Sequence, residues 1–286
     1  MTEPRILVVE GNTKAVRDAT VEAGGRVTAE LYVETLEKCF PGARCDTVRP
    51  TDTDAALADS TGLADYDGIA WTGSALNIYN REPAVDRQIK LGRAALASGV
   101  PVFGSCWGLQ VAVTAAGGEV AKNPIGREFG LARKIALNEA GRAHPLYDGK
   151  ASVFDAVAVH KDEVVALPAG TTVLAGNGHS EVQALEFSVP GGSTFWGVQY
   201  HPEFDLREIS AIARRYGTAL TEEGFFADAA DADRYAEMTA ALQADPGRRD
   251  LAWLLGADAD VLDGHVRLAE IRNWIMRQVL PRLADR

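Results

Sequence analysis

Residues 100–108 read VPVFGSCWG, an apolar run that enters a Gly-x-Cys-x-Gly turn, and residues 109–116 have helical character. A strand that passes into a helix through such a turn presents the central side chain at a sharp, strained bend. Neighbours without a Cβ keep the bend free of clashes and leave room for a substrate. The turn also places Cys106 at a helix N-terminus, where free amides favour a thiolate. These features predict a nucleophile; the alternative is a small buried cysteine in a tight turn.

The chain up to residue 204 is expected to form one α/β domain. Short apolar segments alternate with stretches of helical spacing: residues 6–10, 28–40, 66–71, 83–98, 101–105 and 107–116. This alternation predicts βαβ units and a central, mostly parallel sheet flanked by helices. Residues 131–198 contain several short strand-like segments joined by turns, so the second half should be β-rich. The polar stretch at residues 11–26 lies either near the mouth of a site or on the surface as a loop.

Residues 205–286 read as a C-terminal helical extension with a break at Asp245-Pro246-Gly247. The last segment, residues 266–283, carries an apolar stripe with Trp274 beside it, and such a stripe packs against another element. We expect the extension to pack on the same domain, residues 1–204. Six apolar residues of the extension either pack within the monomer or form a homodimer contact: Phe225, Phe226, Trp253, Leu254, Leu255 and Trp274.

Bulk composition narrows the class of protein. The chain has 286 residues, of which 47% are hydrophobic and 24% charged, which is ordinary for a globular protein. Its net charge of −11 argues against a nucleic-acid partner. The absence of a long apolar run argues against a membrane span, and the first apolar stretch is too short for a signal peptide. Cys39, Cys45 and Cys106 show neither metal-ligand spacing nor a disulfide framework. We therefore expect a cytoplasmic protein without a metal or a cofactor.

A cysteine nucleophile needs a base, and His201 is the best candidate among the five histidines. It follows an expected strand at residues 194–200, where α/β sheets place their functional groups. Glu203 lies two residues further on, so it faces the same side in an extended backbone and can orient the imidazole. Pro202 between them disfavours a helix. The alternative for His-Pro-Glu is a charged corner between strand and loop.

Together, Cys106, His201 and Glu203 resemble the Cys-His-Glu triad of class I glutamine amidotransferases. The resemblance covers residues 5–204, is nearest to free-standing GMP-synthase-like amidotransferase proteins, and implies a flavodoxin-like fold. It also implies an oxyanion hole, formed by the amides of Gly73, in the Thr-Gly-Ser turn after a strand, and of Trp107. Such amides stabilise the charge of a tetrahedral intermediate.

The resemblance also implies substrate-binding residues. Gln110, four residues after the cysteine, is similar to the residue that holds glutamine in the family, and Ser74 belongs to the Gly73 loop. The His160-Lys161-Asp162 segment looks like the family's Ser-His-Gly-Asp segment. His160 and Lys161 are therefore candidate substrate contacts. Because Val159 and Lys161 replace the Ser and the Gly, a structural role for His160 is the alternative.

The predicted activity is that of a glutamine amidotransferase or glutaminase-type hydrolase. Cys106 would form a thioester with a γ-glutamyl group and release glutamate together with ammonia or an amine. One alternative is a γ-glutamyl peptidase acting on glutathione-like conjugates. A second is a catalytically silent regulatory module, although such a module is expected to lose triad residues. Because the chain carries no synthetase domain, a separate ammonia-accepting synthetase is a candidate partner.

Overall fold

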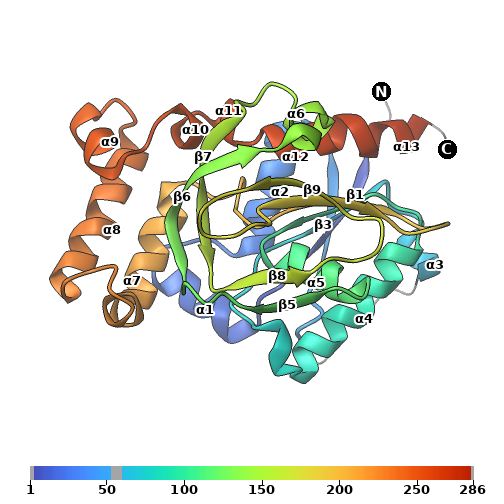
Figure 1. Cartoon of the computed structure of the whole chain (residues 1–286), viewed down its shortest axis with the longest axis horizontal. Helices are drawn as coiled ribbons and strands as arrows, with labels where there is room; N and C mark the ends of the chain where they lie inside the picture. The colour runs from blue at the N-terminus through green and yellow to red at the C-terminus, as the bar shows by residue number, and fades with distance from the viewer. Residues whose placement is uncertain (1–2, 53–59, 285–286) are drawn as a thin grey trace.

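The computed structural model describes residues 3–52 and 60–284, and its central element is a mixed β-sheet (Figure 1). In this part of the chain, nine strands form the sheet in the order β2-β1-β3-β4-β11-β10-β9-β6-β7. The first five strands in that order pair in parallel: β2 (Arg44–Val48), β1 (Arg5–Val9), β3 (Gly68–Trp71), β4 (Val102–Ser105) and β11 (Thr194–Val198). The expected α/β architecture is confirmed.

The second half of the chain is β-rich, as expected, and pairs antiparallel. Four strands extend the sheet beyond β11: β10 (Ala184–Ser188), β9 (Thr172–Gly176), β6 (Glu128–Leu137) and β7 (Val153–His160). A separate pair is formed by β5 (Glu119–Lys122) and β8 (Asp162–Ala166). Neighbouring antiparallel strands can be joined by short turns, whereas parallel strands need longer crossover connections, which are usually helical.

The period-2 pattern of the first strand divides the core into two layers. Ile6 and Val8 face one side of the sheet, and Leu7 and Val9 face the other. Helix α2 (Thr28–Cys39) packs on the Ile6 side, whereas α4 (Pro83–Ala97) and α5 (Trp107–Ala115) pack on the Leu7 side. Short helices complete the domain: α3 (Ser60–Leu63), η1 (Ile78–Asn80), α6 (Glu139–Ala143) and η2 (Pro145–Tyr147). No helix among the described residues is long and apolar enough to span a membrane.

Part of the polar stretch at residues 11–26 is helical, so the alternative of a plain surface loop is wrong for that part. Helix α1 (Lys14–Glu22) begins after Thr13, whose hydroxyl accepts from the amide of Val16. The helix lacks an apolar stripe because a polar side chain makes its inward contact. The buried Arg17 pairs with Asp52 and donates to the carbonyl of Asn12.

The C-terminal extension first leaves the sheet and then returns along it (Figure 1). It consists of α7 (Leu206–Glu222), α8 (Ala229–Ala244), α9 (Arg249–Leu255), α10 (Ala259–Leu262), α11 (Gly264–Arg267), α12 (Ala269–Trp274), η3 (Ile275–Val279) and α13 (Leu280–Ala284). The expected last helix is thus divided, with a π-helical turn at η3. Its apolar stripe does pack on the sheet: Ile271, Ile275 and Val279 are fully buried in the same core layer as Ile6.

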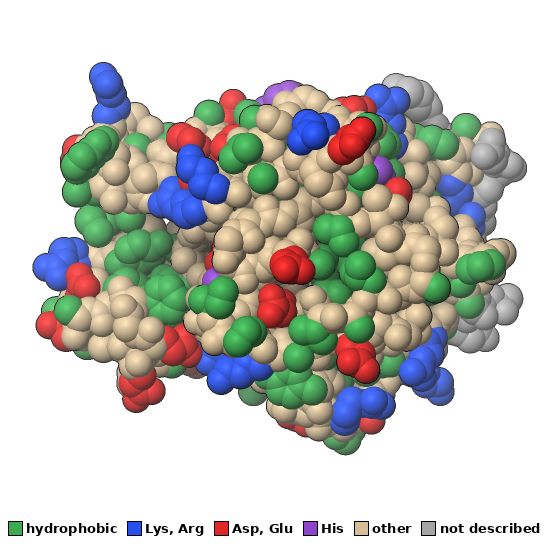
Figure 2. Space-filling model, viewed as in Figure 1, with side chains coloured by type: hydrophobic (Ala, Val, Ile, Leu, Met, Phe, Trp, Pro, Cys, Tyr) green, Lys and Arg blue, Asp and Glu red, His purple; other side chains and the backbone are tan. Residues whose placement is uncertain are grey.

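The apolar residues of the extension separate into two groups. Trp274 is fully buried, with its ring centroid 5.8 Å from that of Phe103, and Phe226 packs on Phe129 and Tyr235. These residues pack within the monomer. Trp253 and Leu254 of α9, by contrast, are 81% and 60% exposed. Hydrophobic and charged side chains are mixed on the surface at this end of the molecule (Figure 2). A homodimer contact through this second group remains a prediction.

Truncating Trp274 should destabilise the fold strongly. A Cβ added to Gly68 of β3 would lie 2.8 Å from the Trp274 ring, so the indole fills the space against the strand. Trp274→Ala is expected to lower the free energy of unfolding by about 3–5 kcal/mol because it leaves a large cavity. Chemical denaturation measures this loss, with the exposed Trp253→Ala as the matched control. Equal stability of the two variants would contradict the assigned packing.

Candidate active site

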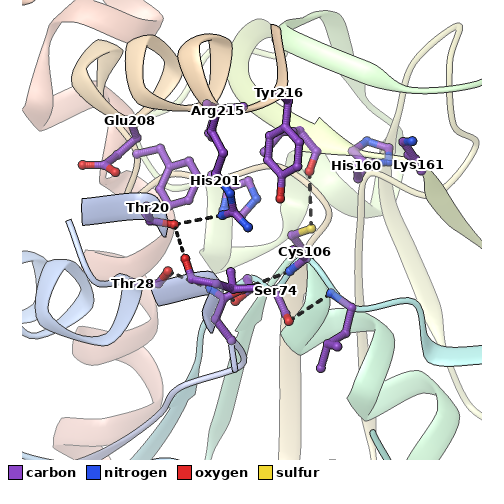
Figure 3. A pocket seen from close by; sticks show the side chains of 18 of the residues that line it. Thr20, Thr28, Ser74, Cys106, His160, Lys161, His201, Glu208, Arg215 and Tyr216 are labelled. Atoms are coloured by element: carbon purple, nitrogen blue, oxygen red, sulfur yellow. Dashed lines mark hydrogen bonds between the residues drawn. The ribbon is translucent and has the colours of Figure 1, made fainter. Parts of the chain in front are cut away.

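A pocket lies at the carboxyl edge of the parallel strands. The turns that follow β3, β4 and β11 carry Gly73, Cys106 and His201, and all three line one cavity of about 230 Å³ (Figure 3). Parallel strands end at the same edge, which is where open α/β sheets bind ligands. The pairing of β4 with β11 brings Cys106 and His201 to this edge. Ser105 pairs with Val198, and the amide of Cys106 donates to the carbonyl of Val198 at 2.7 Å. Residues 95 positions apart in the chain therefore reach the same pocket.

Cys106 occupies the strained bend that the sequence predicts. Its φ of 50° and ψ of −99° place a non-glycine residue at positive φ, directly before α5. A Cβ on Gly104 would lie 2.5 Å from the backbone of Gly108, and one on Gly108 would lie 2.6 Å from the carbonyl oxygen of Trp71. The two glycines therefore allow the turn to pack against α5 and β3. Neither glycine lines the pocket, so the two glycines do not provide the room for a substrate that the sequence led us to expect.

His201 and Glu203 form a buried pair. Nδ1 of His201 lies 2.7 Å from Oε1 of Glu203, and the imidazole stacks on Phe204 at 4.0 Å between ring centroids. Nε2 of His201 is buried and has no hydrogen-bond partner among the described residues. Burial disfavours a charged imidazole, but the negative charges of Glu203 and Cys106 outweigh it and raise the pKa of His201 to about 10. The pair can therefore hold a proton beside the sulfur of Cys106.

The Gly73 loop contacts the imidazole directly. A Cβ on Gly73 would lie 2.5 Å from Cε1 of His201, so a side chain there would displace the ring. The loop is held by Thr72 and Asn12: the Thr72 hydroxyl donates to the carbonyl of Gly73 at 3.0 Å, and Asn12 accepts from the amide of Ala75 at 3.0 Å. Trp107, the other predicted oxyanion-hole residue, opens α5, and the leading amides of a helix have no acceptor within it.

Gln110 and Ser74 line the pocket, as expected of substrate contacts. The side-chain amide of Gln110 donates to Gln199 at 3.3 Å. The hydroxyl of Ser74 donates to the carbonyl of Gly11 at 2.9 Å and accepts from the amide of Leu76 at 3.2 Å (Figure 3). Ser74 thus also braces its own loop.

His160 and Lys161 also line the pocket, but the structure gives each a protein partner. The ring nitrogens of His160 lie 2.9 Å from Glu128 and 3.0 Å from the carbonyl oxygen of Asp162. Burial opposes ionisation of Glu128, yet the hydrogen bond and charge of His160 hold its pKa below the ordinary value. Lys161 forms an ion pair with Glu223 at 2.6 Å. These contacts support the structural alternative for His160.

The polar stretch at residues 11–26 lies at the pocket, which was one of its two predicted places: Val16, Thr20 and Arg26 line it. Sequence reasoning missed the wall that α7 forms, with the lining residues Glu208, Ile212, Arg215 and Tyr216. These α7 residues recur at helical spacing, so the signal was a polar-apolar stripe on the helix that directly follows His-Pro-Glu. Within the described part of the chain, no group of three or more His, Cys, Asp or Glu residues is arranged to hold a metal ion.

Comparison with known proteins identifies the family. The family model of class-I glutamine amidotransferases matches residues 30–215. The chain belongs to the class I glutamine amidotransferase family. Among solved structures of this fold, a glutamine amidotransferase from Thermotoga maritima superposes with a TM-score of 0.63 at 17% identity, covering 98% of this chain and 99% of the other. This superposition therefore also covers the helical extension.

Curated relatives of this chain include both hydrolases and synthases. A γ-glutamyl-L-1-hydroxyisopropylamide hydrolase from a Pseudomonas species is 34% identical over 286 residues, covering 98% of this chain and 95% of the relative. A GMP synthase from Leifsonia xyli is 31% identical over 201 residues, covering 68% of this chain but 37% of the synthase. The γ-glutamyl peptidase 3 of Arabidopsis thaliana is 29% identical, covering 62% of this chain and 70% of the peptidase.

Proposed function

We propose that the protein hydrolyses the γ-glutamyl amide bond of a small molecule through a thioester on Cys106. One observation carries this assignment: a strained cysteine and a histidine that is paired with a buried glutamate line one cavity in a chain of the class I glutamine amidotransferase family. The presence of all three residues argues against a silent regulatory module. Near-full-length similarity to a γ-glutamyl amide hydrolase, against 37% coverage of a GMP synthase, favours hydrolysis over ammonia delivery.

In the first step, the sulfur of Cys106 attacks the γ-carbonyl carbon, and its proton resides on Nε2 of His201. Glu203 stabilises the imidazolium through Nδ1, 2.7 Å away. The negative charge that develops on the carbonyl oxygen is held by the amides of Gly73 and Trp107. Collapse of the tetrahedral intermediate breaks the C–N bond, and His201 transfers its proton to the leaving nitrogen. Ammonia or an amine departs, and a γ-glutamyl thioester remains.

In the second step, water attacks the thioester carbonyl carbon and gives its proton to His201. The C–S bond breaks, glutamate leaves, and the proton returns to the sulfur. The same amides hold the second oxyanion. No electrons leave or enter the system, so the cycle needs no co-reactant besides water.

The α-ammonium of the γ-glutamyl half requires an anionic partner. Asp162 lines the pocket, and its Oδ1 accepts from Tyr79 at 3.1 Å. Burial raises the pKa of this carboxyl group, so an arriving cation would stabilise its ionised form. We assign the α-amino end of the substrate to Asp162, with Gln110, Ser74 and Lys161 as further contacts of the γ-glutamyl half.

Several finer assignments belong to the same proposal. Residues 205–286 form an extension that packs on the domain of residues 1–204. Residues 1–2 and 53–59 of the domain and residues 285–286 of the extension lie outside the described residues. Leu31 and Val157 of the domain share a buried core with Ile209 of the extension, which supports packing of the two parts as one folding unit. A glutathione-like γ-glutamyl conjugate remains an alternative substrate. A cytoplasmic location, an ammonia-accepting synthetase and a homodimer remain predictions.

Covalent labelling tests the nucleophile. The glutamine analogue 6-diazo-5-oxo-L-norleucine should add to Cys106, and mass spectrometry of the digested protein should find the adduct on that peptide alone. Burial raises the pKa of Cys39 to about 11 and that of Cys45 to about 12, so these thiols stay protonated and unreactive. Cys106→Ser should abolish labelling, whereas Cys39→Ser should retain it. Equal labelling of the Cys106→Ser protein would refute the assignment.

A further inference from the structure

Arg215 enters the pocket from α7 in a fixed orientation. Its guanidinium donates from Nη1 to the hydroxyl of Thr20 at 3.0 Å and lies 4.7 Å from the centroid of the Tyr216 ring. Both α7 side chains project toward Cys106 (Figure 3). A guanidinium carries five N–H donors, so most of its donors remain available beyond the contact with Thr20. The group is positioned before any ligand arrives.

The charge of Arg215 is not neutralised by a neighbouring carboxylate. The other Arg and Lys side chains of the pocket each pair with acids: Arg26 with Asp205 and Glu208, Arg127 with Glu223, and Lys161 with Glu223. Among the described residues, Arg215 has no such ion pair. An uncompensated guanidinium in a recessed site attracts an anion, and a carboxylate matches its geometry.

The position of Arg215 relates it to the leaving group. In Figure 3, Arg215 and Thr20 lie on one side of Cys106, and His160 and Lys161 lie on the other. The γ-glutamyl half, whose ammonium and carboxylate share one carbon, extends toward Asp162, the residue after Lys161. With the reacting carbonyl at Cys106, the leaving amine then points the opposite way, toward Arg215.

We propose that Arg215 selects leaving amines that carry a carboxylate, so that the preferred substrates are γ-glutamyl amino acids or short γ-glutamyl peptides. This inference rests on the proposed γ-glutamyl hydrolysis. Arg215 forms charge-assisted hydrogen bonds with the carboxylate of the leaving amine, and Tyr216 and Thr20 hold the guanidinium in place. A neutral leaving amine leaves the guanidinium unpaired.

Two substrates isolate this contact. γ-Glutamyl-L-alanine and γ-glutamyl-L-1-hydroxyisopropylamide differ only in a carboxylate that replaces a hydroxymethyl group on the leaving amine. Wild type should hydrolyse the first with a kcat/KM higher by about tenfold or more, because a charged hydrogen bond contributes that much. Arg215→Ala should lower kcat/KM for γ-glutamyl-L-alanine by about 10- to 100-fold. The hydroxyisopropylamide should lose much less, and Arg215→Lys should retain part of the preference.

Because the two substrates form the same intermediate, comparing them separates a binding role of Arg215 from a structural one. Both substrates form the same γ-glutamyl thioester, so a general disturbance of the site lowers both reactions alike, whereas loss of the carboxylate contact affects one. Arg214, the exposed neighbour on α7, provides the matched control, and Arg214→Ala should leave both reactions unchanged. Equal losses on the two substrates, or a wild-type preference for the hydroxyisopropylamide, would overturn the inference. Absence of glutamate release from both substrates by wild type would overturn the proposed function, and the inference with it.

Discussion

Replacing Cys106 with alanine is expected to lower glutamate release from γ-glutamyl amides by about 10⁴-fold or more. The thioester cannot form without the sulfur, and the amides of Gly73 and Trp107 alone provide only residual stabilisation of the transition state. Glutamate release from glutamine and from γ-glutamyl-L-alanine, followed by an enzyme-coupled assay, measures the loss.

The control for this variant is Cys39→Ala, since Cys39 lies outside the pocket on α2. It should keep wild-type kinetics. Both variants should unfold at a similar denaturant concentration, so that a loss of activity is not a loss of fold. Equal glutamate release by wild type and the Cys106→Ala protein would remove Cys106 as the nucleophile.

Glu203→Gln is expected to move the alkaline limit of activity to lower pH. In the wild type, the pKa of His201 is raised to about 10, chiefly because the charges of Glu203 and Cys106 outweigh burial. The protonated imidazole is therefore retained up to about pH 10 and lost above it. Glutamine carries no charge, so the pKa of His201 should fall toward its ordinary value, and proton donation to the leaving amine should fade at lower pH.

The magnitude of kcat should also fall, by about 10²- to 10⁴-fold, because the orienting partner of the imidazole no longer accepts from Nδ1 as a carboxylate. A kcat/KM profile from pH 6 to 11 on one amide substrate measures both effects. Glu222→Gln, at the exposed end of α7, removes the same charge away from the pocket and should leave the profile unchanged. An unshifted alkaline limb in the Glu203→Gln protein would show that Glu203 does not set the protonation of His201.

The division of the pocket between two parts of the chain has a chemical consequence. Cys106, His201 and the Gly73 loop lie at the ends of sheet strands, where register holds them in place. Arg215 and Tyr216 lie on a helix that packs on α8 outside the sheet. The proposed reacting groups and the proposed leaving-group wall therefore lie on separate parts of the fold, so a substitution in one part need not disturb the other.

Short-range patterns were enough to predict the proposed reacting groups. A strand, a turn and a helix that follow one another around Cys106 define a bend whose geometry depends on neighbours in the chain. His201 and Glu203 are two residues apart, so an extended backbone already places both side chains on one face. The alternation of strands and helices in the first half could also be predicted from local patterns, because buried parallel strands are continuous apolar runs.

Long-range contacts decided the features that local sequence patterns do not reveal. Helix α1 has no apolar stripe, because its buried contact is made by Arg17 with Asp52, and no local pattern reveals a partner 35 residues away. Lys161 and Glu223 lie still further apart in the chain and meet at 2.6 Å. Whether a charged side chain is neutralised or left open to a ligand depends on such partners.

Cys106 could thus be predicted as the nucleophile from its immediate neighbours, because backbone strain at a turn is a local property. That Arg215 remains without a carboxylate while the other Arg and Lys side chains of the pocket are paired could be seen only in the folded chain. The physical reason is that charge compensation depends on distances in space, which tertiary packing sets.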